Sequence, residues 1–266
     1  MINILLIGDV FGEPGRRAIQ ALLPALISEH NISFVVTNVD NAAGGKGVTD
    51  KIAEELFQLP IDVMTAGNHV WEQVSIFPHL ETHPILRPFN VQNQEKGKGY
   101  CVVESRAGIP VAVIHLQGRV FMEKKGKPML SPFKAVEELL WEVRKKTNVI
   151  LVDFHAEATA EKKALGWFLN GKVSCVVGTH THIQTSDEEI LPQGTAYMTD
   201  LGMTGPHLSV IGLDVEIALQ RFLSDGTFKG FKVAKDRVRL EGLIVSIDET
   251  TGKALSVLRI RKDLPL

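Results

Sequence analysis

The segment that decides the fold is Ile2-Asn3-Ile4-Leu5-Leu6-Ile7-Gly8-Asp9, an apolar run that ends in a glycine and a carboxylate. A continuous apolar run of this length, bounded by turn residues, is typical of a buried strand. We do not expect a signal peptide, because the run lacks a basic n-region and a cleavage site and meets an acid at Asp9. The segment therefore predicts a first strand over 2–7, with an acidic side chain just beyond its end.

Six more Val/Ile-rich runs bounded by turn residues predict buried strands along the chain. They cover residues 33–38, 62–66, 111–115, 149–154, 174–177 and 196–199. Helical patterns with Pro, Asp or Thr near their starts are found at 16–29, 49–58, 132–146, 157–168 and 214–223. The alternation of strands and helices predicts βαβ units in the early part of the chain.

The C-terminal part has a different pattern. Residues 228–234, 237–247 and 254–261 alternate more between apolar and polar side chains, and turn-like Ser-Asp-Gly and Asp-Glu-Thr-Thr-Gly segments join them. These runs predict an antiparallel meander. A strand-rich centre closed by these late strands predicts an α/β fold of two packed sheets, with helices on both outer faces.

Length and composition indicate one folded domain over 1–266, because 266 residues lie within the range in which an α/β domain buries a single core. The formal net charge of −2 comes from 29 basic and 31 acidic residues spread through the chain, so we expect no binding of long nucleic acid. No run reaches the ~18 apolar residues that a membrane span requires.

The two cysteines, Cys101 and Cys175, lie in separate apolar stretches without a close-spaced metal motif. Buried reduced thiols are therefore expected rather than a disulfide. Reduced thiols favour the cytoplasm as the location of the protein.

Polar residues of the types that bind metals follow five of the predicted strands, where loops of an α/β sheet normally build sites. These residues are Asp9, Asp40, Asn41, Asn68, His155, His180 and His182. Each motif alone is also explained by turn chemistry or by a structural histidine. His180 and His182 are the most informative pair, because residues two apart in an extended backbone point to one side. Five such coincidences favour a two-metal site.

The mixture of donor types limits the identity of the metal. Carboxylate, amide and imidazole groups without thiolate suit Mn, Fe, Co or Zn better than Ca, which prefers oxygen ligands alone. We therefore expect two divalent transition-metal ions, iron or manganese, with zinc as an alternative.

These motifs resemble the signatures of the calcineurin-like metallophosphoesterase superfamily, and more closely those of the YmdB-like family of bacterial cyclic-nucleotide phosphodiesterases. The resemblance spans nearly the whole chain. It is carried by Ile-Gly-Asp-Val (7–10), Asn-Ala-Ala-Gly (41–44), Gly-Asn-His-Val-Trp (67–71), Leu-Gln-Gly-Arg (116–119), Asp-Phe-His-Ala-Glu-Ala-Thr (153–159), Gly-Thr-His-Thr-His (178–182) and Thr-Asp-Leu-Gly-Met-Thr-Gly-Pro (199–206). It implies a four-layer α-β-β-α sandwich of two mixed sheets, the metallophosphoesterase fold.

The resemblance also implies a division of the ligands between two metals. One metal is expected on Asp9, Asp40, Asn41 and His182, and the other on Asp40, Asn68, His155 and His180, with Asp40 as the bridge. Two positions depart from related patterns. Phe11 stands where many superfamily members carry a histidine, a loss for which Asn41 compensates. Asp40 stands where the family pattern has glutamate. Because the wider superfamily often uses aspartate, the site is expected to survive, although the shorter arm could alter metal spacing or preference.

The reaction hypothesis is hydrolysis by a metal-bridging hydroxide, with polarisation of the phosphoryl oxygens by the metals. His69 would act as the general acid that protonates the departing ribose oxygen, or alternatively it would only orient a ligand. Asp153 is expected to accept an N–H from the imidazole of His155. Arg119 and the loop 202–206 are candidates for contacts with phosphate or ribose.

The resemblance implies that the substrate is a small cyclic nucleotide. The expected activity is hydrolysis of 2',3'-cyclic nucleotides to 3'-nucleotides, with 3',5'-cyclic nucleotides as a second substrate class. Two alternatives remain open: a nucleotide or sugar phosphomonoesterase, and a low-turnover, metal-dependent nucleotide-binding regulator suggested by Asp40. Relatives suggest a homo-oligomer, either a dimer or a tetramer, without membrane association.

Overall fold

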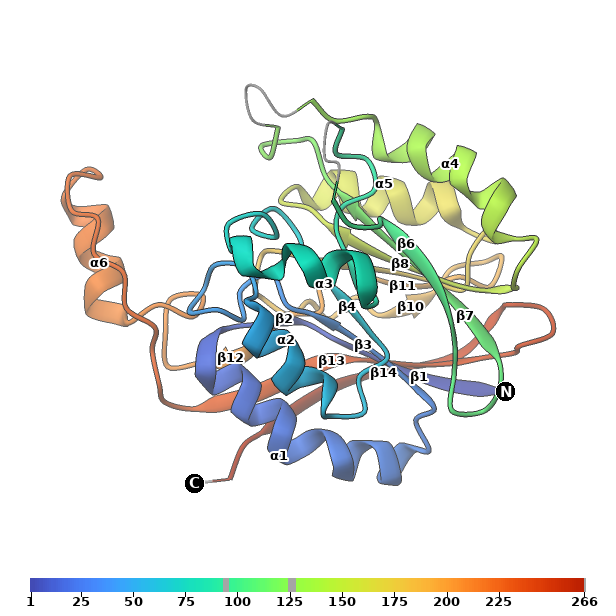
Figure 1. The fold of residues 1–266 in the computed structure, drawn as a ribbon, viewed down its shortest axis with the longest axis horizontal. Helices are drawn as coiled ribbons and strands as arrows, with labels where there is room; N and C mark the ends of the chain where they lie inside the picture. Colours follow the sequence, from blue (N-terminus) through green and yellow to red (C-terminus); the bar gives the residue numbers. More distant parts are fainter. Residues whose placement is uncertain (93–95, 124–127, 266) are drawn as a thin grey trace.

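Two mixed β-sheets lie face to face in the computed structural model, which describes residues 1–92, 96–123 and 128–265 (Figure 1). The first sheet contains β1 (Ile2–Ile7), β2 (Asp9–Val10), β3 (Phe34–Asn38), β4 (Val63–Thr65), β5 (Ile85–Leu86), β12 (Met203–Pro206), β13 (Val238–Ile247) and β14 (Ala254–Asp263). Its order is β2-β12-β13-β1-β3-β4-β5, with β14 beside β13.

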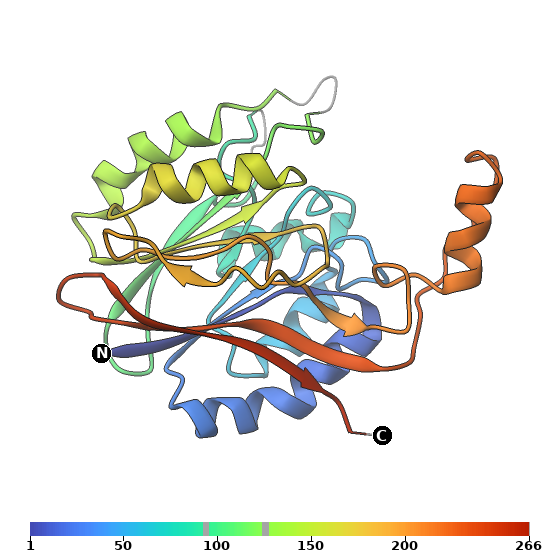
Figure 2. The same cartoon turned by 180° about the vertical axis from the view of Figure 1, so that it is seen from behind.

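The second sheet contains β6 (Tyr100–Glu104), β7 (Pro110–Gln117), β8 (Val149–His155), β9 (Cys175–Thr179), β10 (Glu189–Ile190) and β11 (Ala196–Met198), in the order β10-β11-β9-β8-β7-β6. The helices are α1 (Gly12–His30), α2 (Asp50–Phe57), the short 3-10 helix η1 (Val74–Ile76), α3 (Phe77–Thr82), α4 (Pro132–Val143), α5 (Thr159–Leu169) and α6 (Val215–Leu223). The helices α1, α2 and α3 cover the first sheet, and α4 and α5 cover the second (Figures 1 and 2).

The strand β1 shows why the sequence is apolar without alternation. Leu5 and Ile7 pack in the core beneath α1, α2 and α3, whereas Ile4 and Leu6 pack in the core between the two sheets. Both faces of β1 are therefore buried, and its neighbours β3 and β13 are parallel and antiparallel to it, respectively. A third apolar core lies between the second sheet and α4 and α5. The predicted four-layer sandwich of two mixed sheets is confirmed.

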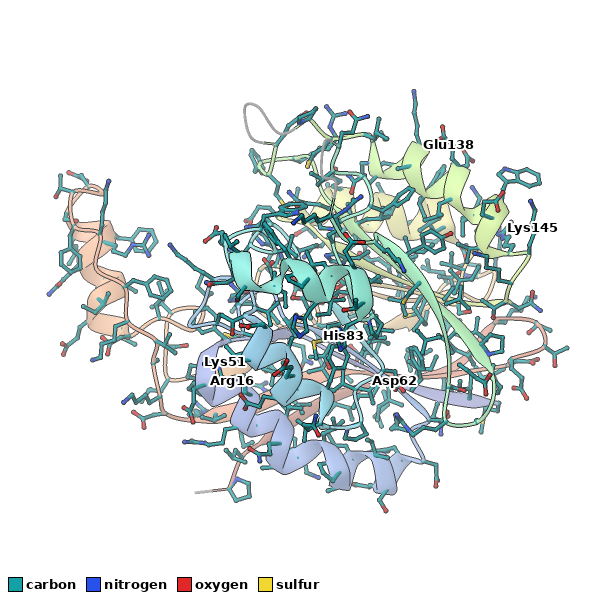
Figure 3. The ribbon with its side chains drawn as sticks, in the orientation of Figure 1. Arg16, Lys51, Asp62, His83, Glu138 and Lys145 are labelled. Atoms are coloured by element: carbon teal, nitrogen blue, oxygen red, sulfur yellow. The ribbon has the colours of Figure 1, made fainter. Side chains whose placement is uncertain are left out.

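Charged side chains mark the outer surfaces of the helical layers. Lys51 on α2 and Glu138 on α4 are exposed, and Glu138 lies on the outer side of α4 (Figure 3). No helix in the described part of the chain is long and apolar enough to cross a membrane.

Most predicted elements are present, but the C-terminal meander is wrong in part. The strands β13 and β14 form the expected antiparallel hairpin. Residues 228–234 form no strand and contribute one isolated bridge, between Val233 and Leu213. Instead of joining a sheet, Phe228 and Phe231 line a hollow beside α6. The predicted loop 202–206 is likewise wrong, because Met203–Pro206 is the buried strand β12, which pairs with β2 and β13.

The helix α6 projects from the body as an arm (Figures 1 and 2). Ala218 is its buried residue, while Leu219, Phe222 and Leu223 are 51%, 78% and 83% exposed. Its apolar stripe therefore has little to pack against within the described chain.

Both cysteines are free thiols, as the sequence predicts. Cys175 is buried, whereas Cys101 is half-buried rather than fully buried. Burial raises the pKa of the Cys101 thiol to about 12, so it is an unreactive group at neutral pH.

Candidate metal centre

The carboxyl ends of parallel strands in the two sheets meet at one place, and the seven predicted ligand side chains follow these strands. From the first sheet, Asp9 follows β1, Asp40 and Asn41 follow β3, and Asn68 follows β4. From the second sheet, His155 ends β8, and His180 and His182 follow β9. The structure brings the seven side chains together in two adjoining groups.

The larger group surrounds one nitrogen of His155. The Nε2 atom lies 3.2 Å from Asp40 Oδ2, 3.2 Å from Asn68 Oδ1 and 3.1 Å from His180 Nδ1. One ring nitrogen carries at most one proton, so it cannot satisfy all three neighbours by hydrogen bonding. Ligands bonded to one ion at 2.0–2.2 Å lie about 3 Å apart, which matches this spacing.

The smaller group surrounds His182. Its Nδ1 donates to the backbone oxygen of Ile211 at 3.0 Å, so in the neutral ring Nε2 presents a lone pair. That nitrogen lies 3.2 Å from Asn41 Oδ1 and 3.7 Å from Asp9 Oδ1, two further acceptors. Burial lowers the pKa of His182, which favours the neutral ring. Three acceptor atoms that face one another in this way fit a cation between them.

Unpaired carboxylate oxygens give an independent test of whether metals fit. Asp9 Oδ1 and Asp40 Oδ2 are buried and have no hydrogen-bond partner. An unpaired buried charge is costly unless an opposite charge compensates for it. Among the described residues, no group of three or more His, Cys, Asp and Glu side chains is by itself arranged to hold a metal ion. The group around His182 takes its third acceptor from the amide of Asn41. The group around His155 already contains Asp40 and His180, so its fit to a metal ion stays a proposal.

The contacts of Asp40 favour the larger group. Its Oδ2 approaches His155, and its Oδ1 accepts a hydrogen bond from the backbone N–H of His69 at 3.0 Å. A bridge from Asp40 to the group around His182 is not among these contacts. The bridging role of Asp40 therefore stays a prediction.

The electrostatics of the site differ between its two carboxylates. Burial and the neighbouring charge of Asp200 raise the pKa of Asp9 well above its usual value. Burial also raises the pKa of Asp40, but His155 and His69 more than offset this, and the net shift is downward. Burial lowers the pKa of His180 to about 2, so its ring is neutral and can donate a lone pair.

The tautomer of His155 is set through Thr179 rather than directly by Asp153, which corrects the prediction from sequence. The hydroxyl of Thr179 donates a hydrogen bond to Asp153 Oδ1 at 2.8 Å. The hydroxyl oxygen of Thr179 also lies 2.9 Å from His155 Nδ1. Because this hydroxyl hydrogen is already used, Nδ1 donates to Thr179 and Nε2 presents its lone pair. Asp153 is held ionised, since His115 and Thr65 lower its pKa in spite of burial.

The loop that carries His180 and His182 is not extended. The prediction that these two side chains point to one side, as residues two apart in an extended backbone do, was therefore wrong. The strand β9 ends at Thr179, and the φ angles of His180 and His182 are 100° and 65°. These left-handed conformations are unfavourable for residues with a side chain and persist only where surrounding contacts impose them. They direct the two rings into different groups rather than to one side.

A buried ion pair, which the sequence did not reveal, imposes this loop conformation. Lys162 and Asp200 are 2% and 1% exposed, and their charged atoms are 2.6 Å apart. Lys162 also donates to the backbone oxygen of Thr179, and Asp200 accepts from the backbone and hydroxyl of Thr181. The pair thus holds the loop by hydrogen bonds to Thr179 and Thr181, the residues on both sides of His180. A lysine in an amphipathic helical pattern carries no sequence signal for such a role.

Gly67 is required by the same site. A Cβ atom at this position would lie 2.2 Å from the ring of His155, so any side chain would displace that imidazole. The sequence signal was the glycine in Gly67-Asn68-His69, a motif that turn chemistry alone would also explain.

The two groups open onto a hollow of about 300 Å³, lined by Phe11, Asn41, His69, Glu157, His180, Thr181, His182, Ile211, Leu213 and Phe231. Arg119 does not line it, because its guanidinium pairs with Glu123 at 3.0 Å. Residues 202–206 do not line the hollow either, because Met203–Pro206 is a buried strand. The backbone oxygen of Gly202 accepts a hydrogen bond from the backbone N–H of Asp9. These two candidates for substrate contacts are not supported by the geometry.

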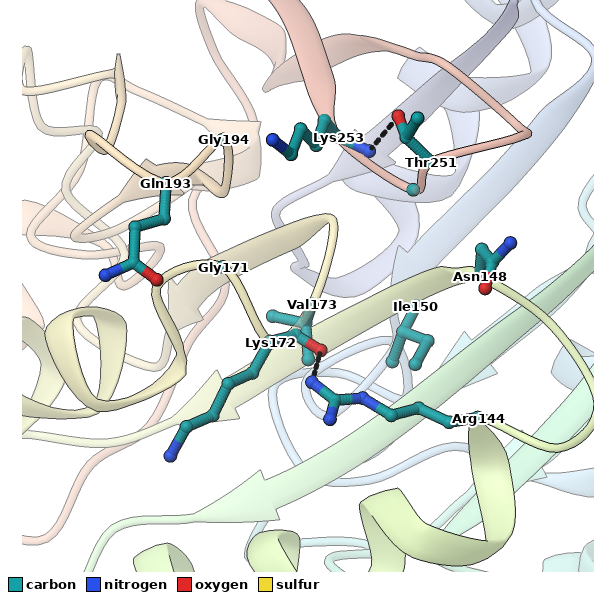
Figure 4. Close-up of a pocket in the computed structure, with 11 residues that line it drawn as sticks. Arg144, Asn148, Ile150, Gly171, Lys172, Val173, Gln193, Gly194, Thr251 and Lys253 are labelled. Atoms are coloured by element: carbon teal, nitrogen blue, oxygen red, sulfur yellow. Dashed lines mark hydrogen bonds between the residues drawn. The ribbon is translucent and has the colours of Figure 1, made fainter.

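A separate hollow of about 320 Å³ lies at the opposite, amino-terminal ends of β8, β9 and β11 (Figure 4). It is lined by basic side chains that include Arg144, but this guanidinium donates to the backbone oxygen of Lys172 at 2.7 Å. None of the predicted ligands line this hollow.

Replacement of Lys162 by methionine is expected to lower the free energy of unfolding by about 3–5 kcal/mol, because Asp200 would keep an uncompensated buried charge. The adjacent Lys163 gives a matched control, since it is 37% exposed and pairs with Asp187 and Glu189 at the surface. Lys163→Met should cost about 0–1 kcal/mol. Urea denaturation of metal-free protein measures the free energy of unfolding of both variants. Equal, small decreases in the two variants would contradict the proposal that the Lys162–Asp200 pair holds the loop.

Comparison with known proteins agrees with this architecture. A Bacillus subtilis protein named 2',3'-cyclic-nucleotide 2'-phosphodiesterase is 44% identical over 260 residues, which cover 97% of this chain and 96% of the relative. The crystal structure of a novel phosphatase from Mycoplasma pneumoniae matches with a TM-score of 0.91 and 32% identity, over 98% of this chain and 93% of that one.

A hypothetical protein from Thermus thermophilus matches equally well, with a TM-score of 0.91, 37% identity, and coverage of 99% of this chain and 100% of the other. The relatives named as a phosphodiesterase and a phosphatase indicate a hydrolytic enzyme. The model of the family described as YmdB-like protein matches residues 5–260. From this match and these relatives, the chain belongs to the YmdB-like family.

Proposed function

We propose that this enzyme is a dimetal phosphodiesterase that hydrolyses 2',3'-cyclic nucleotides to 3'-nucleotides, with 3',5'-cyclic nucleotides as a second substrate class. The observation that carries the proposal is the set of acceptor atoms that face one another around the buried, unpaired oxygens of Asp9 and Asp40. The name of the Bacillus subtilis relative supports the choice of substrate.

Membership of a metallophosphoesterase-like family implies the use of metal ions, and the donor set fits two of them. One ion would be held by Asp9, Asn41 and His182, the other by Asn68, His155 and His180, and Asp40 would contribute to both. When bound, such ions supply polarisation of the phosphoryl oxygens and a reactive nucleophile from water. Imidazole, amide and carboxylate ligands favour iron or manganese, with zinc as an alternative.

His69 has the surroundings of a general acid. Its Nδ1 lies 2.7 Å from Glu72 Oε1, and an ionised carboxylate can only accept, so Nδ1 carries a hydrogen. The Nε2 atom is then left for the substrate in the hollow that His69 lines. To act as the acid, the ring must carry a hydrogen on both nitrogens, a form that the neighbouring carboxylate of Glu72 stabilises. In the proposed reaction, this imidazolium gives its Nε2 proton to the departing ribose oxygen, which would otherwise leave as an unstable alkoxide.

One assay separates the candidate functions. Protein loaded with manganese is incubated with 2',3'-cyclic AMP, 3',5'-cyclic AMP and a simple phosphomonoester, and the products are separated by chromatography. Formation of adenosine 3'-monophosphate from 2',3'-cyclic AMP is expected. Cleavage of the monoester alone would overturn the proposal.

A phosphomonoesterase remains the second candidate, because a structural relative is named a phosphatase. A third is a low-turnover nucleotide-binding regulator, for which the shorter arm of Asp40 is the reason. Tight binding of cyclic nucleotide without product in the same assay would favour that regulator.

Replacement of His69 by glutamine is expected to lower kcat on 2',3'-cyclic AMP by about 10²–10⁴-fold, the usual contribution of a general acid. Metal content should be unchanged, since the His69 side chain is outside both groups of acceptor atoms. Lys51→Gln, on the exposed face of α2, is the control and should leave kcat unchanged. Turnover by His69→Gln equal to the wild type would exclude the acid role.

We further propose one metallophosphoesterase domain over 1–266 and a cytoplasmic location, supported by the shared inter-sheet core and by two free thiols. A homo-oligomer, either a dimer or a tetramer, is supported by the exposed apolar stripe of α6. Light scattering should give two or four chains per particle, and a monomer would exclude the assembly.

A further inference from the structure

Two hollows adjoin one another beside the candidate metal centre. The smaller, of about 300 Å³, is lined by Asn41, His180 and His182 from the two groups of acceptor atoms, together with apolar side chains. The larger, of about 940 Å³, lies beside α6 and is lined by Phe222 and Phe228, with the charged residues Lys46, Arg221, Asp225 and Lys229 also in its lining. Ile211, Leu213 and Phe231 line both hollows. A ligand that extends from the smaller hollow into the larger one would therefore pass these three apolar side chains at the boundary between the hollows.

Phe231 presents an aromatic surface at this boundary. Its side chain is 44% exposed, whereas Phe11, the other phenylalanine that lines the smaller hollow, is 3% exposed. The ring of Phe231 has room for a flat group against it, and Phe11 does not.

The position of the Phe231 ring is fixed by a glycine. A Cβ atom at Gly45 would lie 2.7 Å from Phe231 Cζ and 2.9 Å from Phe11 Cζ, and the φ angle of Gly45 is 93°. Only a bare backbone allows both rings to approach this closely. The backbone oxygen of Gly45 also accepts a hydrogen bond from Asn41 Nδ2 at 3.1 Å. The loop that supports Phe231 is thus tied to a proposed metal ligand.

The charge near the ring also suits a nucleotide. Lys46 Nζ lies 5.8 Å from the centroid of the Phe231 ring, and Lys46 lines the larger hollow. A lysine stem is flexible, so it can leave the ring face when a flat group arrives. An ammonium at the entrance attracts an anionic ligand from solution.

We propose that Phe231 stacks on the nucleobase of the substrate while the phosphate lies in the smaller hollow beside Asn41, His180 and His182, an inference that rests on the proposed function. A nucleotide combines an anion with a flat aromatic base, and the two adjoining hollows offer one surface for each. Stacking on an aromatic ring tolerates every base, because each base has a π-face. Phe231 is therefore a specificity-determining residue that selects nucleotides over other cyclic phosphates.

The test compares two substrates that share a five-membered cyclic phosphate but differ in the base. Phe231→Ala should raise the KM for 2',3'-cyclic AMP by about 5- to 150-fold, the range that one base stack supplies, with little change in kcat. The kcat/KM for glycerol 1,2-cyclic phosphate, which has no base, should stay within about twofold of the wild type. Phe231→Trp should restore the KM for 2',3'-cyclic AMP, which a merely structural loss would not allow.

Phe222→Ala is the matched control, because Phe222 lines the larger hollow without lining the smaller one. It should leave both substrates unaffected. One outcome would overturn the stacking proposal. If Phe222→Ala and Phe231→Ala lower kcat/KM for both substrates equally and also reduce the particle mass in light scattering, a second copy of the chain occupies the larger hollow.

A binding measurement keeps the stacking proposal separate from the proposed function. Equilibrium dialysis compares adenosine 3'-monophosphate with inorganic phosphate on metal-loaded wild type and Phe231→Ala. A preference for the nucleotide that falls about 5-fold or more in the variant supports stacking, even if neither cyclic substrate is cleaved. Unchanged preference overturns stacking, even if both substrates are cleaved as the proposed function expects.

Discussion

The mutual repulsion of buried acceptor atoms is the constraint on which the site depends. His155 and His182 each use Nδ1 as a donor, to Thr179 and to Ile211, and their Nε2 lone pairs face oxygens of other side chains. Such an arrangement is unfavourable without a cation. The fold holds it in place because Lys162 and Asp200 fix the intervening loop, and because Gly67 leaves room for the ring of His155.

The sandwich fold explains why residues from five separate segments can meet. The strands β1, β3 and β4 run parallel in one sheet, and β7, β8 and β9 run parallel in the other. The carboxyl ends of each set therefore lie at one edge of its sheet. The core between the sheets fixes these two edges against each other. Rigid strands therefore position the ligands, while the loops beyond them form the walls of the hollow.

Sequence reasoning was strongest where one local pattern determined one element. The apolar run of β1 and the helical periods predicted the layers, and residue types at strand ends predicted which side chains gather. It failed where distant partners decide the outcome. The left-handed conformation of His180 depends on Lys162 and Asp200, the role of Asp153 passes through Thr179, and residues 228–234 pack beside α6 instead of extending a sheet. None of these contacts has a local sequence signal.

The number of divalent ions bound per chain is the most direct test of the account. Elemental analysis of protein dialysed against manganese at micromolar concentration should give two ions per chain in the wild type, and Asp40→Asn should lower that number. A wild-type chain that binds no ion under these conditions would contradict the central claim, because the facing lone pairs and the unpaired oxygens of Asp9 and Asp40 would then need another explanation.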